Sequence, residues 1–339
     1  MTDFCKISLK PLTAHEADIG YKAAALRTLL GSTRISPKLS FSRSEFFQNS
    51  RQYSQGMSIS GVQQKLSLKI DDQRRLSPTA EGGEFILKPS PEAYPYAAEN
   101  EHAAMQLSKL LGIETAHCGL VSFTGDELAY ITRRFDRTEG HGKAHQEDLL
   151  QCFNIPSEEK YRKTYEDAGK LLHLVTGGKQ AVVLDFLRRV IFAYLTGNDD
   201  LHLKNLSVQR LPGNTSIHYD KLTPNYDCLF CDALSDNDNP TGLGQLALGL
   251  LRDPADGEEQ FSVMHAHYGY YTGFDFIELG KRLGLPEKAV LKFIGLLDRR
   301  KTEIIDLIHR SHMPKPMQQR AAALVTARLG ALRIIAQKG

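Results

Sequence analysis

A long apolar helix is the feature that most constrains how this chain of 339 residues can fold. Between Lys179 and Leu195, apolar residues recur at the i, i+3, i+4 spacing that is typical of a helix with a buried face. Gly197 can end this helix, and the polar run from Asn198 to Asn205 follows directly. The side chains of that run are therefore expected to lie in a loop that is fixed by the protein core.

Within this run, Asp200 stands five residues before Asn205. A phosphoryl-transfer enzyme needs both groups, because a carboxylate must accept the proton of the attacking hydroxyl and an amide oxygen must hold Mg²⁺ on the nucleotide phosphates. The catalytic loop of protein kinases has the same spacing. A polar helix end followed by a turn explains the run equally well if the run is taken alone.

Asp227 is the observation that favours phosphoryl transfer over a simple turn. It comes after a predicted hairpin of two short strands, Leu206–Gln209 and Ser216–His218. A kinase needs one more carboxylate on its metal ion, and the chain reaches this carboxylate through a hairpin after the catalytic loop. An acidic turn before Asp232–Asp238 would explain Asp227 alone, so the argument depends on the combination.

Lys88 is the third element of the predicted site. It ends the apolar strand Glu84–Lys88, from which its ammonium group can reach the α- and β-phosphates of a nucleotide. An acidic partner is expected on the following helix, Ala97–Leu111, where Glu99 and Glu101 both qualify. The sequence leaves the choice between these two carboxylates open.

The order of strands and helices predicts an α+β fold with two lobes, like that of a protein kinase. Alternating apolar residues indicate strands before about residue 137, whereas helical periodicity dominates after it. A chain of this length also favours two lobes over a single core. We predict an amino-terminal appendage at residues 1–57, a sheet-containing lobe at 58–137 and a helical lobe at 138–339.

Charge and composition narrow the class of protein. The net charge of +2 does not favour direct binding to nucleic acid, and 24% charged residues are ordinary for a soluble protein. The sequence has no recognisable signal peptide or membrane span, and its five cysteines suit a reducing compartment. We therefore expect a cytoplasmic protein that does not bind membranes.

The segment Ser58–Lys65 is a candidate phosphate-covering loop. Gly61 stands among small residues there, so backbone amides could approach anionic oxygens. The segment lacks the G-x-G-x-x-G and Walker patterns, and a polar turn that enters a strand explains it as well.

Together these segments resemble the HipA family of bacterial serine/threonine kinases, the toxin components of toxin–antitoxin systems. The resemblance covers the chain from about Ser58 to the carboxyl terminus. The matching segments are the loop Ser58–Lys65, the strand end Phe85–Lys88, the lobe connection Arg133–Arg137 with His145–Asp148, the catalytic loop Asp200–Asn205, and Asp227 after Leu222-Thr223-Pro224.

The resemblance implies ATP and Mg²⁺ as cofactors, with Asp200 as the catalytic base and with Asn205 and Asp227 as metal ligands. A serine of the phosphate loop, Ser58 or Ser60, is implied as an inhibitory autophosphorylation site, where added negative charge would oppose the ATP phosphates. The residues implied to bind the nucleotide are Ile59, Ser60, Gly61, Val62, Gln63, Gln64, Lys88, Arg133, Arg134, Phe135, His202, Lys204, Asn205, Tyr226 and Asp227.

The short amino-terminal region makes the chain similar to HipT, the short toxin of three-component HipBST systems. Only the residues before Ser58 are present ahead of the loop, too few for the amino-terminal subdomain of full-length HipA proteins. The resemblance implies two antitoxin partners, a small HipS-like protein and a HipB-like DNA-binding protein, so contact with DNA would be indirect. It also implies an aminoacyl-tRNA synthetase, glutamyl or tryptophanyl, as the protein substrate, and phosphorylation would block translation.

Two other functions are open at this point. A small-molecule phosphotransferase would share the aspartate–asparagine loop, and a catalytically weak kinase-like protein would act by sequestering partners. The presence of the base, both metal ligands and the lysine argues against the second function.

Overall fold

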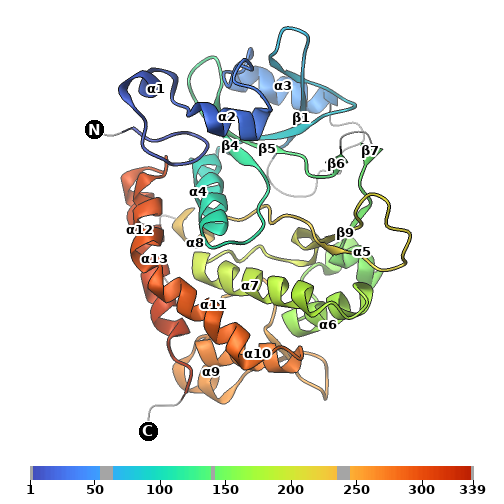
Figure 1. The fold of residues 1–339 in the computed structure, drawn as a ribbon. Helices are drawn as coiled ribbons and strands as arrows, with labels where there is room; N and C mark the ends of the chain where they lie inside the picture. Colours follow the sequence, from blue (N-terminus) through green and yellow to red (C-terminus); the bar gives the residue numbers. More distant parts are fainter. Residues whose placement is uncertain (1–2, 54–63, 139–141, 235–244, 337–339) are drawn as a thin grey trace.

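Residues 3–53, 64–138, 142–234 and 245–336 are described by a computed structural model of the chain. They form an α+β structure in which a sheet region packs against a mainly helical region (Figure 1). This arrangement confirms the predicted fold class. The predicted boundaries between the appendage and the two lobes stay predictions.

The larger sheet of the described residues has five antiparallel strands in the order β2-β1-β3-β5-β4. The strands are β1 (Leu66–Ile70), β2 (Leu76–Pro78), β3 (Phe85–Pro89), β4 (Cys118–Ser122) and β5 (Leu128–Arg133). Because side chains alternate between the faces of a strand, Leu68 and Ile131 belong to the hydrophobic cluster on one face, whereas Leu120 and Tyr130 belong to the cluster on the other. Lys88 stands opposite Tyr130 in the register of β3 and β5.

Helices cover both faces of this sheet. After α1 (Ala14–Ile19), the helices α2 (Ala23–Leu30) and α3 (Arg43–Tyr53) cover one face, and α4 (Ala97–Leu110) covers the other. Five buried apolar residues of α4 belong to the larger hydrophobic cluster, which continues into the helical region; they are Ala98, Ala103, Ala104, Met105 and Leu107. The two regions therefore share one core, and α4 is the element between them.

The helical region is built around α7 (Gln180–Thr196), which is buried along most of its length. The other helices described there are α5 (Leu149–Phe153), α6 (Tyr165–Val175), α8 (Cys231–Leu234), α9 (Val263–Tyr268), α10 (Gly273–Arg282), α11 (Glu287–Arg299), α12 (Lys301–Arg310) and α13 (Lys315–Leu332), with the 3-10 helices η1 (Ser157–Glu159) and η2 (Leu203–Asn205). None of the described helices is long and apolar enough to cross a bilayer.

Short strands complete the described structure. β8 (Gln146–Asp148), β9 (Ser207–Gln209) and β10 (Lys221–Leu222) form a small sheet in the order β10-β9-β8. β6 (Arg137–Thr138) pairs with β7 (Gly142–Lys143), and β11 (Leu251–Arg252) pairs with β12 (Glu259–Gln260). The first of these pairs begins at Arg137, the last residue of the segment Arg133–Arg137 that the resemblance assigns to the lobe connection.

The predicted strand Ser216–His218 is wrong, because β9 pairs with β10 and β8 instead. The chain turns at this point because side chains bond to the nearby backbone. Ser216 N donates to Asn214 Oδ1 at 2.7 Å, and His218 N donates to Ser216 Oγ at 3.0 Å. Asp227 still follows a hairpin, which β9 and β10 form.

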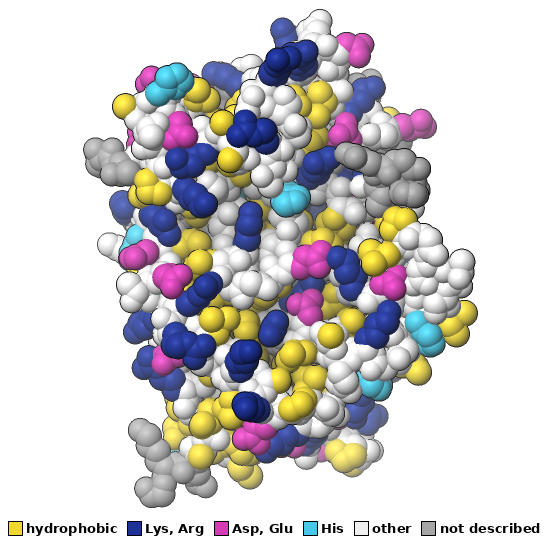
Figure 2. Space-filling model, viewed as in Figure 1, with side chains coloured by type: hydrophobic (Ala, Val, Ile, Leu, Met, Phe, Trp, Pro, Cys, Tyr) yellow, Lys and Arg dark blue, Asp and Glu magenta, His cyan; other side chains and the backbone are white. Residues whose placement is uncertain are grey.

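Basic side chains are distributed unevenly over the surface. Residues 281–339 contain thirteen Lys and Arg against four Asp and Glu, although the whole chain has a net charge of only +2. Figure 2 shows Lys and Arg side chains gathered on the side of the molecule where α12 and α13 lie. The net charge therefore does not describe each face of the protein.

Candidate active site

The loop Asn198–Asn205 begins where α7 ends, as the sequence predicts. Gly197 is the C-cap of α7 with a φ of 63°, a left-handed conformation that glycine adopts most easily. A Cβ atom on Gly197 would lie only 2.8 Å from Leu324 Cδ2, so a larger residue does not fit without rearrangement. The loop therefore leaves the core at a fixed point.

Asp200, the predicted base, is half exposed at the start of this loop. Its Oδ1 accepts a hydrogen bond from Tyr161 Oη at 2.9 Å, and His202 Nε2 lies 3.5 Å from the same oxygen. Its backbone carbonyl accepts a hydrogen bond from Asn205 Nδ2 at 2.8 Å. The carboxylate is thus fixed by its neighbours and reachable from solvent, which suits a group that accepts a proton.

The amide of Asn205 fits the predicted role in holding Mg²⁺. Because Nδ2 donates to the carbonyl of Asp200, Oδ1 is directed away from this contact and is available to a cation. The described residues contain no group of three or more His, Cys, Asp or Glu that could hold a metal by themselves. Mg²⁺ does not need such a group, because one or two protein oxygens hold it together with substrate phosphates. Asn205 and Asp227 offer those oxygens.

Lys88 is the centre of a buried ion cluster. Its Nζ lies 2.7 Å from Glu101 Oε1, 2.5 Å from Asp227 Oδ1 and 5.5 Å from the ring centroid of Tyr130. Burial lowers the pKa of Lys88, but the carboxylates of Asp227 and Glu101 raise it by more, so the ammonium group stays charged. Of the two partners that the sequence left open, the structure selects Glu101.

Asp227 is ionised in this cluster. Burial raises the pKa of Asp227, whereas the charges of Lys88 and Lys65 lower it, and the charges prevail to leave a pKa of about 2. The backbone of Asp227 has a φ of 57°, which is uncommon for residues other than glycine. Such a conformation persists only where the surrounding contacts fix it.

Two asparagines fix the backbone on either side of Asp227. Asn100 Nδ2 donates to Phe230 O at 3.1 Å, and Asn100 Oδ1 accepts from Phe230 N at 2.7 Å, so one fully buried amide pairs with both backbone groups of a residue. Asn225 is bonded through its own backbone to the segment 114–116. α4 therefore contacts the chain around Asp227 directly.

His202 lies between the two acidic residues of the site. Its Nε2 is near Asp200. Burial lowers the pKa of the imidazole by more than the charges of Asp200 and Asp227 raise it, so the ring is neutral at pH 7. Nδ1 is buried without a hydrogen-bond partner among the described atoms. The structure thus brings the predicted base, the histidine and the predicted metal carboxylate together.

The predicted lobe connection, Arg133–Arg137, begins at the last residue of β5. The ring of Phe135 packs on Tyr226 with a centroid distance of 5.6 Å, and Tyr226 Oη donates to Lys204 O at 3.0 Å. The guanidinium group of Arg134 donates hydrogen bonds of 2.9 and 2.7 Å to the two carboxylate oxygens of Asp136. Phe135 and Tyr226 are therefore joined to the catalytic loop, and Arg134 fixes the turn beside them.

Lys204 and Arg133 are hydrogen-bonded to residues outside the ion cluster. Lys204 Nζ donates to Ser157 Oγ in η1 at 3.1 Å. Arg133 is the last residue of β5, half buried, and its backbone N donates to His117 O at 2.8 Å. Their contacts with a nucleotide stay predictions.

The predicted phosphate loop is described only at its end. Ser58, Ile59, Ser60, Gly61, Val62 and Gln63 lie outside the described residues. Gln64 is exposed, and Lys65 comes directly before β1. Lys65 is close enough for its charge to act on Asp227 and Glu101. The segment therefore enters the sheet beside the ion cluster.

Asn100 and Tyr161 are site residues that the sequence did not indicate. Asn100 is separated from Phe230 by 130 residues, and Tyr161 is separated from Asp200 by 39. Neither residue belongs to a spaced motif, so only the folded chain reveals these contacts.

A family model described as HipA-like C-terminal domain matches residues 57–303. The chain belongs to this HipA-like family. A relative from Haemophilus influenzae, named "Putative kinase", is 39% identical over 328 residues that cover 93% of each protein. The serine/threonine-protein kinase toxin HipA of Shewanella oneidensis is 29% identical over 266 residues, which cover 72% of this chain and 55% of that protein.

Two solved structures share the fold of this HipA-like chain. HipA of Shewanella oneidensis, in a complex with HipB and operator DNA, has a TM-score of 0.60 at 23% identity and covers 81% of this chain and 64% of its own. The proinflammatory kinase CtkA of Helicobacter pylori has a TM-score of 0.54 at 16% identity and covers 79% of this chain and 94% of its own. At such identities the likeness shows the fold alone, which is protein-kinase-like.

Proposed function

We propose that this HipA-like protein is an ATP-dependent serine/threonine protein kinase. The observation that carries the proposal is the contact of 2.5 Å between Lys88 and Asp227. It joins the residue assigned to the nucleotide phosphates with the residue assigned to the metal ion, although 139 residues separate them. Two relatives that are named as kinases support the proposal.

In the proposed reaction, Asp200 accepts the proton of a serine or threonine hydroxyl while that oxygen attacks the γ-phosphorus of ATP. The bond between the γ-phosphorus and the β–γ bridging oxygen breaks, and ADP leaves. Lys88 neutralises phosphate charge, and its ion pair with Glu101 keeps the ammonium group in position. Mg²⁺, when bound by Asn205 and Asp227, supplies further positive charge to the phosphates.

We assign the nucleotide to the neighbourhood of Lys88, the catalytic loop and the Phe135–Tyr226 pair. By the family resemblance, the assignment includes Ile59–Gln64 among the nucleotide-binding residues and gives Arg133, Arg134 and Phe135 to the adenine end. His202 and Lys204 contribute from the catalytic loop. The packing of Phe135 on Tyr226 supports the assignment, because it brings the lobe connection next to the residue before Asp227.

The biological role that we propose is that of a toxin which phosphorylates an aminoacyl-tRNA synthetase, tryptophanyl or glutamyl, and so blocks translation. Membership of the HipA-like family supports this role. The match covers 55% of the Shewanella toxin, so the substrates and partners of this chain are part of the proposal. We assign the chain to the short HipT type and propose autophosphorylation at Ser58 or Ser60 as its inhibition.

The proposed partners are a HipB-like DNA-binding antitoxin and a small HipS-like protein. A HipA structure that contains HipB and operator DNA supports the first partner. Contact with DNA would then occur through the antitoxin. The small HipS-like partner follows from the assignment to the HipT type.

Phosphosite mapping tests these assignments. Purified wild-type protein and the Asp200→Ala variant are each added with ATP and Mg²⁺ to a bacterial lysate, and phosphopeptides are identified by mass spectrometry. We expect new phosphoserine on one aminoacyl-tRNA synthetase and on Ser58 or Ser60 with the wild type only. A phosphorylated metabolite without new phosphoprotein would favour a small-molecule phosphotransferase. In a separate experiment in which each protein is expressed in growing cells, equal growth arrest by both proteins would favour partner sequestration.

A further inference from the structure

An exposed tyrosine donates a hydrogen bond to one carboxylate oxygen of the predicted base, Asp200. Tyr161 is 48% exposed, and its hydroxyl donates to Asp200 Oδ1 at 2.9 Å. The ring of Tyr161 meets the ring of His202 edge-on with a centroid distance of 5.2 Å. His202 Nε2 approaches the same oxygen, Oδ1, at 3.5 Å. Both side-chain contacts of the carboxylate in the described structure therefore use Oδ1, and neither uses Oδ2.

We propose that Tyr161 is a positioning residue that fixes the carboxylate of Asp200 so that Oδ2 receives the proton of the substrate hydroxyl. The inference rests on the proposed kinase function. A carboxylate whose rotamer is already fixed does not have to be oriented during the reaction, so less entropy is lost on the way to the transition state. Tyr161 keeps its own proton throughout, and the proton released by the substrate is bound by Asp200.

The segment that carries Tyr161 is tied to the catalytic loop at several points. Lys160 O accepts a hydrogen bond from Leu203 N at 3.4 Å, and Tyr165 Oη donates to Leu201 O at 2.9 Å. These bonds lie on both sides of Tyr161 along the chain. The hydroxyl therefore reaches Asp200 from a support that is joined to the same loop, which is the arrangement expected of a residue that sets an orientation.

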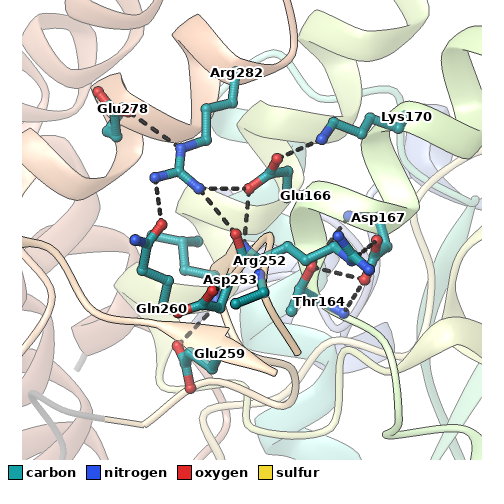
Figure 3. A network of polar contacts seen from close by, with 12 residues as sticks. Thr164, Glu166, Asp167, Lys170, Arg252, Asp253, Glu259, Gln260, Glu278 and Arg282 are labelled. Carbon is teal, nitrogen blue, oxygen red and sulfur yellow. Dashed lines mark hydrogen bonds and ion pairs between the residues drawn. The ribbon is translucent and has the colours of Figure 1, made fainter. Parts of the chain in front are cut away.

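The start of α6, directly after this segment, is anchored by a polar network that Figure 3 shows. Thr164 caps α6 through a reciprocal pair of bonds with Asp167. Glu166, which is buried, is bonded to Lys170 at 2.5 Å, to Arg282 at 3.0 Å and to the backbone N of Arg252 at 2.9 Å. α6 is thereby fixed to α10 and to the β11–β12 pair.

The chemistry of the phenol agrees with a positioning role. Burial and the Asp200 carboxylate raise the pKa of Tyr161 above its ordinary value. The hydroxyl is therefore protonated at neutral pH and donates its hydrogen bond to the carboxylate. A substrate hydroxyl must in turn donate to Asp200, and the second oxygen is the place left for it.

The test compares Tyr161→Phe, which removes only the hydroxyl, with Tyr94→Phe as a matched control. Tyr94 is 47% exposed, and it lies outside the assigned site. The rates of ADP formation and of ³²P incorporation into the protein itself are measured against ATP concentration. We expect Tyr161→Phe to lower kcat about 10-fold, the effect of one lost hydrogen bond to a charged group. KM for ATP should change less than about twofold, and Tm should change by about 1 °C or less, because an exposed hydroxyl contributes little to folding.

Three results for Tyr161 would overturn the inference while the wild type is active. These are an unchanged kcat in Tyr161→Phe, a raised kcat that marks the hydroxyl as a block to substrate, and phosphate on Tyr161 itself, which would make it an acceptor. An equal loss of kcat in Tyr94→Phe would have the same meaning. A wild type without transfer would overturn the proposed function first and this inference with it.

Discussion

Lys88 Nζ lies 2.5 Å from Asp227 Oδ1 and 2.7 Å from Glu101 Oε1. One buried ammonium group therefore joins β3, α4 and the segment after β10. Each of its partners has a different role in the account, since Glu101 positions the lysine and Asp227 offers an oxygen to the metal ion. Replacing one partner at a time should therefore change activity in different ways.

Replacing Glu101 should impair phosphoryl transfer, whereas replacing Glu99 should not. In Glu101→Gln the ammonium of Lys88 is left with Asp227 alone and moves from its position beside the phosphates. We expect kcat/KM for ATP to fall roughly 10- to 100-fold, the size of effect found when a positioned charge is lost. Glu99→Gln should stay within about twofold of wild type. Steady-state kinetics of ADP formation measures both, and the reverse ranking would show that Glu101 is not the functional partner.

Glu99 should make the folding stability depend on pH. Burial raises the pKa of Glu99 to about 7, with smaller opposing effects from its own backbone and from Ser90. A raised pKa in the folded state means that this stabilising contribution is complete below the ordinary value of 4.5 and is lost as the pH rises through about 7. Glu99→Gln cannot ionise and avoids this loss.

Thermal unfolding at two pH values checks this expectation. At pH 8 the variant Glu99→Gln should melt about 2–4 °C above the wild type, and at pH 5 the difference should shrink. A difference in Tm that is the same at pH 5 and pH 8 would show that the side chain does not titrate in this range.

Asn100 should affect the metal requirement rather than stability alone. Asn100→Ala removes both hydrogen bonds to Phe230 and releases the chain that holds Asp227 at a positive φ. We expect the Mg²⁺ concentration for half-maximal activity to rise about 10-fold, in addition to a destabilisation of roughly 1–3 kcal/mol from the unpaired backbone groups.

Gln318→Ala is the matched control for Asn100→Ala. Gln318 is also a buried amide, and its Nε2 donates to Ser311 O at 2.8 Å and to Met313 O at 3.0 Å in the turn between α12 and α13. This control should lower Tm by a similar amount and leave the Mg²⁺ requirement unchanged. If the Mg²⁺ requirement rises equally in both variants, Asn100 contributes only to the stability of the fold and does not position Asp227.

The sequence predicted the parts of the fold that carry a periodic apolar signal. α7 has a continuous apolar stripe and ends at Gly197, and both features are visible in the residues. α4 spans Ala97–Leu110 and was predicted as Ala97–Leu111. α1, by contrast, contains no buried residue. A helix without an apolar face has no helical period in its sequence, so it could not be predicted from periodicity.

The sequence indicated several residues of the candidate site, but it did not indicate all of the contacts between them. The spacing of Asp200 and Asn205 and the positions of Lys88 and Asp227 were readable from the chain, because each follows a recognisable element. The choice of Glu101 was not readable, because Glu99 is also buried on the same helix and only the packing of α4 against β3 distinguishes them.

The central claim is that Asp200 is the base of an ATP-dependent protein kinase, and the most direct test is transfer of ³²P from γ-labelled ATP with Mg²⁺. The account predicts that the wild type labels protein and that Asp200→Ala transfers about 10²- to 10⁴-fold more slowly while it still binds ATP. Equal labelling by the two proteins, or no labelling by the wild type under any Mg²⁺ concentration, would contradict the claim.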